Sequence, residues 1–401
     1  MNLHSDYPFW MIKDGIKNVF PSLEADTKTD VLIIGGGISG ALIGNHISNA
    51  GLDTIIVEKR HIGFGSTSAS TAMLQYEIDT PLFKLMEIKG TEQAIRAYRI
   101  CAEAIEKLEK ICDEIPGAAN FETHPSLFYA STKKDARQII MPEFEARKAA
   151  GFKVTLLSEE NIASQFGFRA PAGILSEEGA HVDPYLLTQH LLGKMQQKGC
   201  RIYDLTEVDI WDPNSKNVVV KTTKGHSITA KYVVVACGYE SQNYLPQKVT
   251  QLNSTFAIVS KPIASLADFW LQNSLLWETK TPYLYIRTTN DHRIIVGGRD
   301  EPFYSPKKRD QILTAKRLKL EADFKKLFPN IPFQTDFAWA GTFGETKDGL
   351  PYIGSFNSPR ILFALGYGGN GITFSVAAAE ILGDIILKNK NNDNELFSFD
   401  R

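Results

Sequence analysis

The chain has 401 residues, of which 43% are hydrophobic and 22% charged, and its formal net charge at pH 7 is −2. This length is enough for two sizeable cores, or for one domain with a large insertion. The near-neutral charge gives no reason to expect nucleic acid or an anionic membrane as a partner. No apolar run reaches the roughly 18 residues that a transmembrane helix needs.

The first 20 residues contain no apolar h-region, and the four cysteines are scattered without C-x-x-C spacing. We therefore expect a cytoplasmic protein with reduced thiols. The eight histidines are dispersed and form no H-x-x-x-H pair, so we expect no metal site. Residues 1–28 precede the first predicted strand. The stretch Tyr7-Pro-Phe-Trp10 and the pair Phe20-Pro21 predict an arm pinned by aromatic contacts, with a disordered leader as the alternative.

A strand, a glycine turn and a helix follow the arm. The apolar run Val31–Ile34 predicts a buried parallel strand, and Ile38–Asn49 predicts a helix. Between them lies a G-x-G-x-x-G motif formed by Gly35, Gly37 and Gly40. A second buried strand, Leu52–Val57, ends at Glu58.

This arrangement predicts a dinucleotide site. Gly35 allows the tight turn, Gly37 lets a pyrophosphate approach the backbone, and Gly40 lets the helix pack on the strand. The free N–H groups at the helix start, around Ile38 and Ser39, face the phosphates. Glu58 is placed to accept hydrogen bonds from ribose hydroxyls. A glycine-rich turn in another α/β protein is the alternative, and the motif alone leaves FAD and NAD both open.

The segment after Glu58 is rich in Gly, Ser and Thr. It reads as backbone laid along the ligand, although a flexible surface loop has a similar composition. The hydroxyls of Ser66, Thr67 and Ser68 can reach phosphate or ribityl oxygens. Ala72 and Met73 are small or pliable enough for a flat ring to lie close.

The middle of the chain alternates predicted helices and strands. Helical periodicity with three- and four-residue spacing is typical of Thr91–Glu114. Asp183-Pro184 predicts the start of a helix, with the proline at its first position. The other expected elements are a strand over Phe121–Ala130, helices over Lys134–Gly151 and Glu159–Gln165, a hairpin over Gly173–Asp183, and the helix Tyr185–Lys198.

Two groups of strands follow. Arg201–Val208, Asn217–Thr222 and His226–Ala236 predict a meander whose apolar last strand rejoins the parallel sheet beside the first strand. Alternating or β-rich runs then predict an antiparallel sheet, and Lys307–Leu327 predicts a solvated surface helix. The runs of that sheet are Gln251–Pro262, Tyr283–Thr289 and Arg293–Gly298.

The C-terminal block again has a strand, a glycine turn and a helix. Ile361–Ser375 contains Gly366-Tyr-Gly-Gly-Asn-Gly371 and leads into an Ala-rich helix that ends near Leu387. No acid follows on a further strand, so this is no second dinucleotide motif. We expect Gly366–Gly371 to pack against the far end of the same ligand.

Three separated blocks together resemble one family. They are the N-terminal glycine motif with Glu58, the loop beginning Gly63-Phe-Gly-Ser, and Asp348–Gly354 with the Gly366 turn. The chain resembles the FAD-dependent D-amino acid oxidase/glycine oxidase/sarcosine oxidase superfamily, and most of all its γ-glutamylputrescine oxidase-type branch.

The resemblance implies an α/β fold with a Rossmann-like, mainly parallel FAD-binding domain and an inserted antiparallel-sheet α+β substrate domain. The expected boundaries are 1–80, 183–245 and 335–401 for the FAD domain, and 81–182 and 246–334 for the substrate domain. We expect FAD to be bound by Gly35, Gly37, Ile38, Ser39, Gly40, Glu58, Lys59, Gly65, Ser66, Thr67, Ser68, Ala72, Met73, Val208, Gly238, Gly341, Gly368, Gly369, Asn370, Gly371 and Ile372.

Three departures from the family pattern change what is expected. Thr342-Phe343 stands where glycine oxidase-like members carry a carboxylate-binding arginine, which argues against a simple α-amino acid held in that manner. Ala340, Gly341 and Thr342 offer no cysteine for flavin attachment, so the FAD is expected to be noncovalent. Ala69-Ser70 replaces the branch's usual Arg-Asn.

The implied reaction is oxidation of the C–N bond of an amine or N-substituted amino acid. A hydride passes to flavin N5, water hydrolyses the imine, and oxygen or another acceptor reoxidises the flavin. The helix start after Gly369-Asn370-Gly371 is the candidate for stabilising negative charge on the reduced flavin.

Period-two alternation places Tyr283, Tyr285 and Arg287 on one face, as candidates for the substrate pocket. Phe343 and Trp339 are candidates for its apolar walls. Ordinary sheet and core packing remain the alternatives for these residues. A flavin dehydrogenase that passes electrons to a quinone or carrier protein, and a non-catalytic flavoprotein-fold module, remain open as functions. The partner expected is a small-molecule amine or amino acid, and the oligomeric state is left open.

Overall fold

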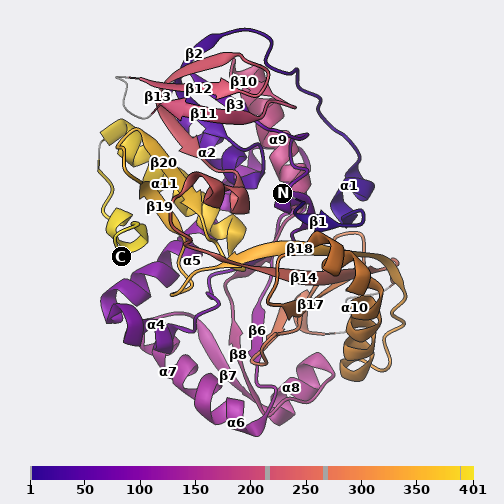
Figure 1. Ribbon diagram of the computed structural model, residues 1–401. Helices are drawn as coiled ribbons and strands as arrows, with labels where there is room; N and C mark the ends of the chain where they lie inside the picture. Colours follow the sequence, from indigo (N-terminus) through magenta and orange to yellow (C-terminus); the bar gives the residue numbers. More distant parts are fainter. Residues whose placement is uncertain (1, 213–216, 265–269, 389) are drawn as a thin grey trace.

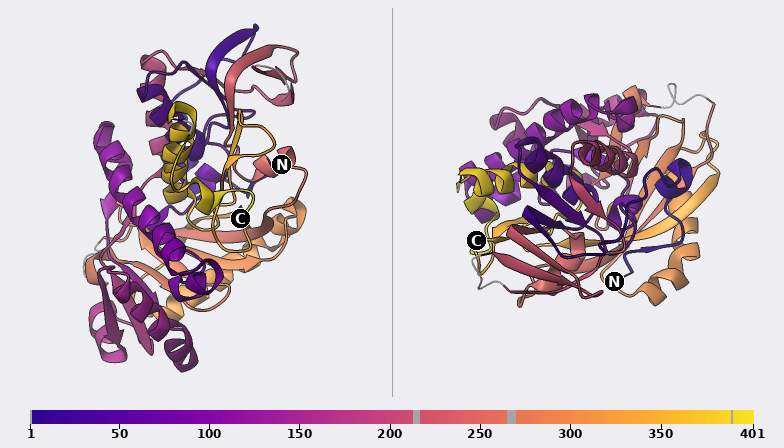
Figure 2. Two further views of the ribbon diagram at one scale, coloured as in Figure 1. Left: turned by 90° about the vertical axis from the view of Figure 1, so that its left-hand side faces the viewer. Right: turned by 90° about the horizontal axis from the view of Figure 1, so that it is seen from above.

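A computed structural model describes residues 2–212, 217–264, 270–388 and 390–401. Within these ranges the strands form two large sheets and one small sheet (Figure 1). Further views show the two large sheets as separate layers, with the C-terminal helix lying beside the smaller of them (Figure 2). This arrangement confirms the predicted α/β fold class.

The smaller of the two large sheets contains the N-terminal glycine motif. Strands β10, β3, β2, β13 and β20 run parallel in that order, while β12, β11 and β19 add antiparallel neighbours. As predicted, the apolar end of β13 lies beside β2, with Tyr232 opposite Val31. The bounds are β2 (Thr27–Ile34), β3 (Thr54–Val57), β10 (Arg201–Tyr203), β11 (Val208–Asp212), β12 (Val218–Thr222), β13 (Ser227–Val235), β19 (Tyr352–Ser355) and β20 (Ile361–Leu365).

The prediction of one continuous strand at the start of the meander is wrong. The segment 201–208 divides into β10, which pairs with β3 at one edge, and the start of β11, which pairs with β12 at the other. The chain turns at Leu205, whose φ is +46°. A residue with positive φ cannot continue an extended strand, so one predicted strand becomes two.

Helices cover the smaller sheet. α2 (Ile38–Asn49) has the predicted bounds, and α9 (Pro184–Gln197) begins as predicted, because the Asp183 side chain accepts a hydrogen bond from Leu186 N at 2.9 Å. α11 (Gly371–Lys388) packs against α2 and α5 (Thr91–Asp113). α4 (Leu82–Lys89) joins the same hydrophobic core. Short helical turns complete this part: α1 (Phe9–Asp14), α3 (Ser66–Ala69), η1 (Pro116–Asn120), η3 (Gly238–Tyr244) and η5 (Asn394–Phe397).

The larger sheet is almost wholly antiparallel, as predicted. Its order is β1-β18-β14-β17-β16-β15-β6-β8-β7, and among the described strands only β15 and β6 pair in parallel within it. The bounds are β1 (His4–Ser5), β6 (Ser126–Tyr129), β7 (Val154–Ser158), β8 (Ala172–Ser176), β14 (Gln251–Ser260), β15 (Leu275–Glu278), β16 (Tyr285–Thr288), β17 (Ile294–Glu301) and β18 (Thr335–Glu345). The helical segments near this sheet are α6 (Lys133–Asp135), η2 (Ala136–Ile140), α7 (Met141–Ala149), α8 (Glu159–Phe166), η4 (Leu271–Asn273) and α10 (Pro306–Leu327).

One predicted hairpin and one predicted continuous strand are wrong. The expected hairpin over Gly173–Asp183 does not form, because β8 lies in the larger sheet and β9 (Gly179–His181) pairs with β4 (Met73–Gln75) and β5 (Glu122–Thr123) in the small sheet. The single strand predicted over Phe121–Ala130 is likewise divided into β5 and β6. Pro125 lies between them and has no N–H to donate to a ladder.

Two predicted helices also differ from the structure. The helix expected over Lys134–Gly151 contains a π-helical stretch, η2, which ends two residues before Pro142. Proline lacks the N–H of a regular helical hydrogen bond, so the backbone widens there. α10 is not merely a solvated surface helix, because Arg309, Lys316, Leu320 and Phe324 are buried against the sheet.

The predicted pinned arm is present. β1 pairs with β18, with His4 opposite Gly341, and Phe9 and Trp10 are almost fully buried. Ile12, Ile16 and Val19 on the same segment are exposed.

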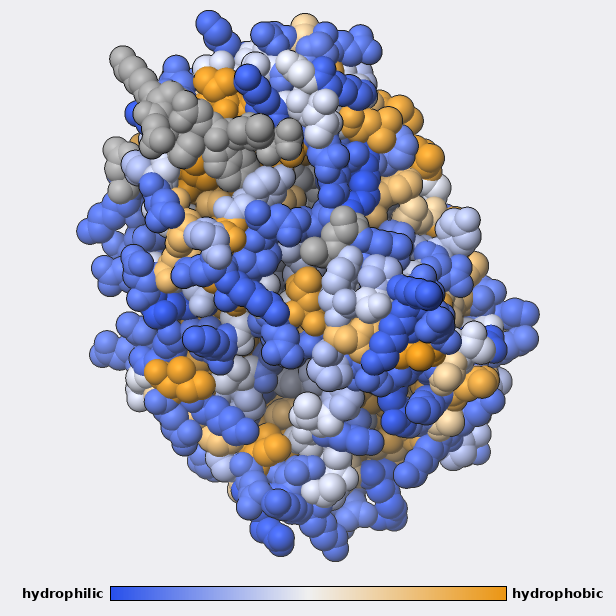
Figure 3. All heavy atoms as spheres, in the orientation of Figure 1, coloured by the Kyte–Doolittle hydropathy of each residue, from blue (hydrophilic) through white to orange (hydrophobic). Residues whose placement is uncertain are grey.

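The face in Figure 3 is mostly polar, with apolar side chains in small separate patches. Among the described residues, none of the helices combines the length and apolar character needed to cross a bilayer.

The sheets divide the chain differently from the expected domain boundaries. β18, placed with the FAD domain on sequence, is a strand of the larger sheet, and so is β1. Helices α4 and α5, placed with the substrate domain, share a hydrophobic core with α2 and α11. The boundaries at 335 and 81 therefore do not coincide with the sheets.

Candidate active site

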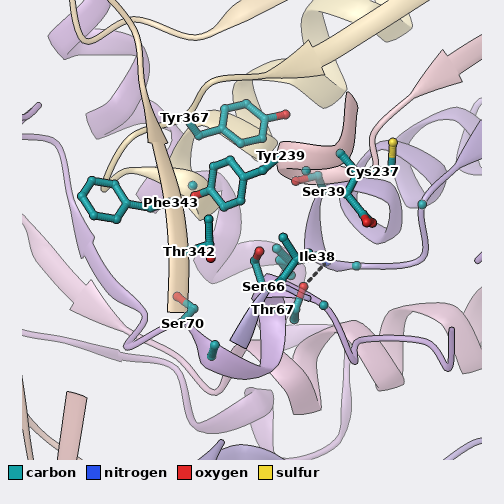
Figure 4. Close-up of a pocket in the computed structure, with 18 of the residues that line it drawn as sticks. Ile38, Ser39, Ser66, Thr67, Ser70, Cys237, Tyr239, Thr342, Phe343 and Tyr367 are labelled. Atoms are coloured by element: carbon teal, nitrogen blue, oxygen red, sulfur yellow. Dashed lines mark hydrogen bonds between the residues drawn. The ribbon is translucent and has the colours of Figure 1, made fainter. Parts of the chain in front are cut away.

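A cavity lies between the two large sheets. It begins at the glycine turn after β2 and extends to the aromatic residues of β16 and β18. In the close-up, the rings of Phe343, Tyr239 and Tyr367 lie on one side of the cavity, and Ser66 and Thr67 lie on the other (Figure 4). Both halves of the fold therefore contribute to one site.

The glycines of this turn leave space between backbone segments that the Cβ of any other residue would fill. Gly35 has a φ of +116°, and a Cβ there would lie 2.5 Å from Ala236 O. A Cβ on Gly40 would lie 1.9 Å from Gly35 O. Gly37 precedes α2 and lines the cavity, where a Cβ would meet Thr67 Oγ1 at 2.9 Å. The start of α2 is thereby open to a phosphate group.

Glu58 lies at the end of β3 and is held by two backbone amides. Gly36 N donates to Oε2 and Arg60 N donates to Oε1, each at 2.9 Å. Burial raises the pKa of Glu58, and the two amides oppose that shift. Beside it, Glu240 accepts from Lys59 Nζ at 2.7 Å and from Arg60 Nη1 at 3.0 Å. The carboxylate of Glu58 is therefore fixed at this end of the cavity.

The serine-rich loop forms the side of the cavity. Thr67 Oγ1 accepts from Ile38 N at 2.9 Å, which ties the loop to the start of α2 (Figure 4). Ser66 Oγ is buried and finds no hydrogen-bond partner within the part of the chain that the structure describes. A buried hydroxyl that lines a cavity without a hydrogen-bond partner is suited to bind a polar group of a ligand. Ser68 instead donates to Gly65 O and lies behind the lining.

The C-terminal glycine turn closes the opposite side. Gly368 N donates to Gly344 O, and a Cβ on Gly371 would meet nothing within 4 Å. Asn370 directs its amide away from the cavity, donating to Gln75 O at 3.0 Å and Glu77 O at 2.8 Å. It fixes the turn to the segment after β4.

Most of the residues predicted on sequence line this one cavity. Gly40, Ser68, Asn370 and Arg287 are outside the lining. Those in the lining are Gly35, Gly37, Ile38, Ser39, Glu58, Lys59, Gly65, Ser66, Thr67, Ala72, Met73, Val208, Gly238, Gly341, Gly368, Gly369, Gly371 and Ile372, with Tyr283, Tyr285 and Phe343.

Arg287 is fully buried, although it shares a strand face with Tyr285. Its guanidinium donates to Thr71 O at 2.6 Å, Thr288 O at 3.1 Å and Val182 O at 3.2 Å. Burial lowers its pKa to about 9. Its side chain supports the loop behind the cavity. Trp339 does the same, donating from Nε1 to Ala69 O at 2.9 Å.

Sequence reasoning missed several lining residues. Tyr239 and Tyr367 come from turns after strands, while Thr255 and Asp300 come from β14 and β17. One signal was present for β17: the pair Gly297-Gly298 interrupts a strand just before Asp300. A Cβ on Gly297 would lie 2.2 Å from the Tyr285 ring, so this glycine makes room for the tyrosine.

The strands also bring together three residues that the sequence leaves dispersed. One potential metal-ligand atom from each of Glu122, His124 and His181 lies within 4.8 Å of the others. The two imidazole rings stack with centroids 4.5 Å apart, and His181 Nε2 lies 2.9 Å from Asn290 Oδ1. Burial, with the nearby charge of Arg287, lowers the pKa of His181. Two neutral histidines beside the buried guanidinium of Arg287 fit side-chain packing better than the binding of a metal ion.

A family model described as "DAO: FAD dependent oxidoreductase" matches residues 30–385. The chain belongs to this family. Its cofactor is FAD and it is an oxidoreductase, as the sequence predicted. This DAO-family chain is 24% identical to gamma-glutamylputrescine oxidoreductase of Escherichia coli K12, over 92% of this chain and 85% of the relative. It is 27% identical to glycine oxidase of Bacillus subtilis, over 92% and 96%.

Solved structures of the DAO family share the fold. L-proline dehydrogenase from P. horikoshii superposes with a TM-score of 0.78 at 20% identity, over 93% of this chain and 97% of that one. The residues of the cavity fit FAD, because Glu58, the open start of α2 and the unpartnered Ser66 hydroxyl are the groups that a ribose and a diphosphate need. The glycine turn before α11 leaves space on the opposite side.

Proposed function

We propose that this DAO-family protein oxidises the C–N bond of a small amine. Two relatives are named for reactions of an amine and of an amino acid. The observation that favours an amine is the pair Thr342-Phe343, which lines the cavity where glycine oxidase-like members carry an arginine. Bound FAD supplies the acceptor for the hydride, and water then hydrolyses the substrate's imine.

The substrate end of the cavity is aromatic. Tyr283, Tyr285, Tyr239 and Phe343 line it, and the Tyr285 hydroxyl lies 3.3 Å from Thr255 Oγ1. These rings exclude water and enclose the alkyl part of an amine. The reacting nitrogen must have lost its extra proton by the time the hydride leaves, because an ammonium nitrogen has no lone pair to form an imine. We propose the larger sheet as the substrate-binding part of the molecule.

The start of α11 has an electrostatic role in this proposal. Gly371 and Ile372 line the cavity at the first turn of an 18-residue helix. The positive end of the helix dipole and free N–H groups there favour negative charge on a bound group. We also propose that the FAD is noncovalent, because Ala340–Thr342 contain no cysteine. Acid precipitation of the protein is expected to leave the yellow flavin in the supernatant.

The experiment that tests the function is anaerobic bleaching of the flavin. Purified protein is mixed with a panel of primary amines, secondary amines and N-substituted amino acids, with neutral alcohols as the control. Amines are expected to bleach the visible flavin band and to yield a carbonyl product. Readmitting oxygen then separates an oxidase, whose colour returns at once, from a dehydrogenase that needs a quinone or carrier. Bleaching by D-amino acids alone would contradict the proposal, and colourless protein would favour a non-catalytic module.

A further inference from the structure

Carboxylates gather at the aromatic end of the cavity. Asp300, near the end of β17, lines it, and Oδ1 of this carboxylate is buried with no hydrogen-bond partner among the residues described. Asp79, in the loop after β4, accepts from the Tyr283 hydroxyl at 3.0 Å and from Gly369 N at 2.9 Å. Glu345 ends β18. Asp79 and Glu345 are exposed and lie outside the lining, so Asp300 is the carboxylate inside the cavity and the other two add negative charge near it.

The three carboxylates act on one another. The pKa of Asp300 is raised to about 7, first by burial and then by the charges of Asp79 and Glu345. Hydrogen bonding to Thr255 and the charge of Lys316 oppose that rise only in part. Burial and the charge of Asp79 also raise the pKa of Glu345. The fold therefore maintains mutual repulsion that a bound cation would relieve.

Basic side chains compensate this charge only in part. In the described ranges, Lys59 and Arg60 are the only lysine or arginine side chains in the cavity lining, and both pair with Glu240 near Glu58. Lys316 on α10 is turned to the other side of β17, where Nζ lies 2.7 Å from Glu301 Oε1. Arg299 pairs with Asp323. A substrate carboxylate would find no cation here.

Aromatic faces lie beside the carboxylates. The rings of Tyr283 and Tyr285 have centroids 5.7 Å apart, and both line the cavity. The face of a tyrosine ring attracts an ammonium group, and the attraction is stronger when water is excluded. Carboxylates and tyrosines together are the surroundings that an organic cation requires.

We propose that this end of the cavity binds a cationic amine without an α-carboxylate, and that Asp300 holds its ammonium group against Tyr283 and Tyr285, while Asp79 adds negative charge from outside the lining. The inference rests on the proposed function, since it names the substrate class of that same site. It separates simple amines from α-amino acids by charge, because the acid group of an α-amino acid would be repelled by the same carboxylates that attract its ammonium group.

The test uses two ligands of matched shape and opposite charge. tert-Butylamine has no hydrogen on the carbon beside its nitrogen, so it cannot be oxidised to an imine, and pivalate replaces the ammonium by a carboxylate. Each is titrated into the FAD-loaded protein at pH 8, and binding is read from the shift of the visible flavin spectrum. tert-Butylamine is expected to bind at least about tenfold more tightly than pivalate.

Variants then identify the groups responsible. Asp300→Asn is expected to weaken tert-butylamine binding about tenfold, and Asp79→Asn by a smaller factor, because Asp79 acts from outside the lining. Glu301→Gln, the adjacent position on β17 with its side chain towards Lys316, is the matched control and should leave binding unchanged. Retained flavin and an unchanged melting temperature show that each variant is folded. The two aspartate variants test the same site independently if one of them folds poorly.

Acidification gives a second readout. A proton competes with the ligand for Asp300, so wild-type affinity should fall as the pH drops from 8 to 6, while Asp300→Asn should change much less. Equal binding of pivalate, no binding of tert-butylamine, or an Asp300→Asn variant that binds tert-butylamine within twofold of wild type would each overturn the inference. If tert-butylamine binds as expected but no oxidisable amine bleaches the flavin, the proposed function fails while the cation site stands.

Discussion

Gly40 and Gly44 lie one turn apart on the same face of α2 but meet different surroundings. A Cβ on Gly40 would lie 1.9 Å from Gly35 O, which is backbone in a tight turn. A Cβ on Gly44 would meet the tips of side chains, with Ile56 Cδ1 at 2.8 Å. Side-chain tips can rotate away, whereas the turn carrying Gly35 cannot move without changing the backbone at the start of α2.

Gly40→Ala is therefore expected to lose FAD, while Gly44→Ala keeps it. The Gly40 variant should be destabilised by about 1–3 kcal/mol or more, and the Gly44 variant by less. The ratio of flavin to protein absorbance after purification reports FAD retention, and urea denaturation reports stability. Equal flavin content in the two variants would show that α2 can shift away from the strand at no cost to the site.

At the residue scale, what the sequence predicted was local. The glycine motif and Glu58 are fixed by spacing within about 25 residues, so their places in the cavity could be inferred. The roles of Arg287 and Asp300 depend on which strands flank β16 and β17 and on where the cavity ends. Alternation put Arg287 on the correct face but could not show that backbone carbonyls of Thr71 and Val182 capture it.

The N-terminal arm is tied to the larger sheet through one buried arginine of α10. Arg309 donates to Ser5 Oγ at 2.6 Å, to Thr342 Oγ1 at 2.7 Å and to Asn2 O at 3.3 Å. Thr342 N in turn donates to Leu3 O at 2.9 Å. Leu3 lines the cavity, so the arm forms part of its wall.

Arg309→Met should release this arm. The substitution leaves the hydroxyls of Ser5 and Thr342 without a donor, at a cost of about 1–3 kcal/mol. Amide hydrogen exchange over residues 2–14 is expected to accelerate, and FAD affinity to fall, because Leu3 is no longer held. Arg317→Met is the matched control, since Arg317 is exposed on the same helix. Unchanged exchange at the arm in Arg309→Met would show that β1 pairing alone holds it.

Elements with local start and stop signals were predicted well, and elements defined by distant partners were not. The bounds of α2 and the start of α9 follow from glycine turns and the Asp183 cap. The division of β5 from β6, and of β8 from β9, accompanies the pairing of β9 with β4 and β5, and both partners are distant from β9 in sequence. α10 was assigned to the surface as a charged amphipathic helix, yet its buried face includes Arg309 and Lys316, whose hydrogen-bond partners lie on other elements.

Across the whole molecule, the segment 75–80 connects the C-terminal turn to α7. Asn370 donates to the carbonyls of Gln75 and Glu77, and the Glu77 carboxylate accepts from Arg147 Nη1 at 3.2 Å. Arg147 Nε also donates to Glu143 Oε1 at 2.6 Å. All three charged side chains are at most 3% exposed. A buried ion network thus links α7 to the loop that carries Asp79.

Removing the single cation of this network should destabilise the protein far more than removing all three charges. Arg147→Met leaves two buried carboxylates unpaired, which is expected to cost about 3–5 kcal/mol. Burial already raises the pKa of Glu77, and loss of Arg147 would raise it further, so the penalty is largest at pH 8 and shrinks as the pH falls and the carboxyl takes up a proton. The triple variant Glu77→Gln, Glu143→Gln and Arg147→Met has no buried charge and should recover most of the loss.

Urea denaturation of the FAD-loaded proteins at pH 8 and pH 6 measures these differences, with Lys148→Met as the exposed neighbouring control. Because Asn370 and Asp79 both depend on the segment that Glu77 anchors, Arg147→Met should also retain less flavin, and the triple variant should regain it. If the single and triple variants were equally destabilised, the loss would come from the packing of the arginine stem against Tyr76 and Phe128 and not from uncompensated charge. The pH dependence separates the two causes independently, since lost packing alone would lower stability equally at both pH values.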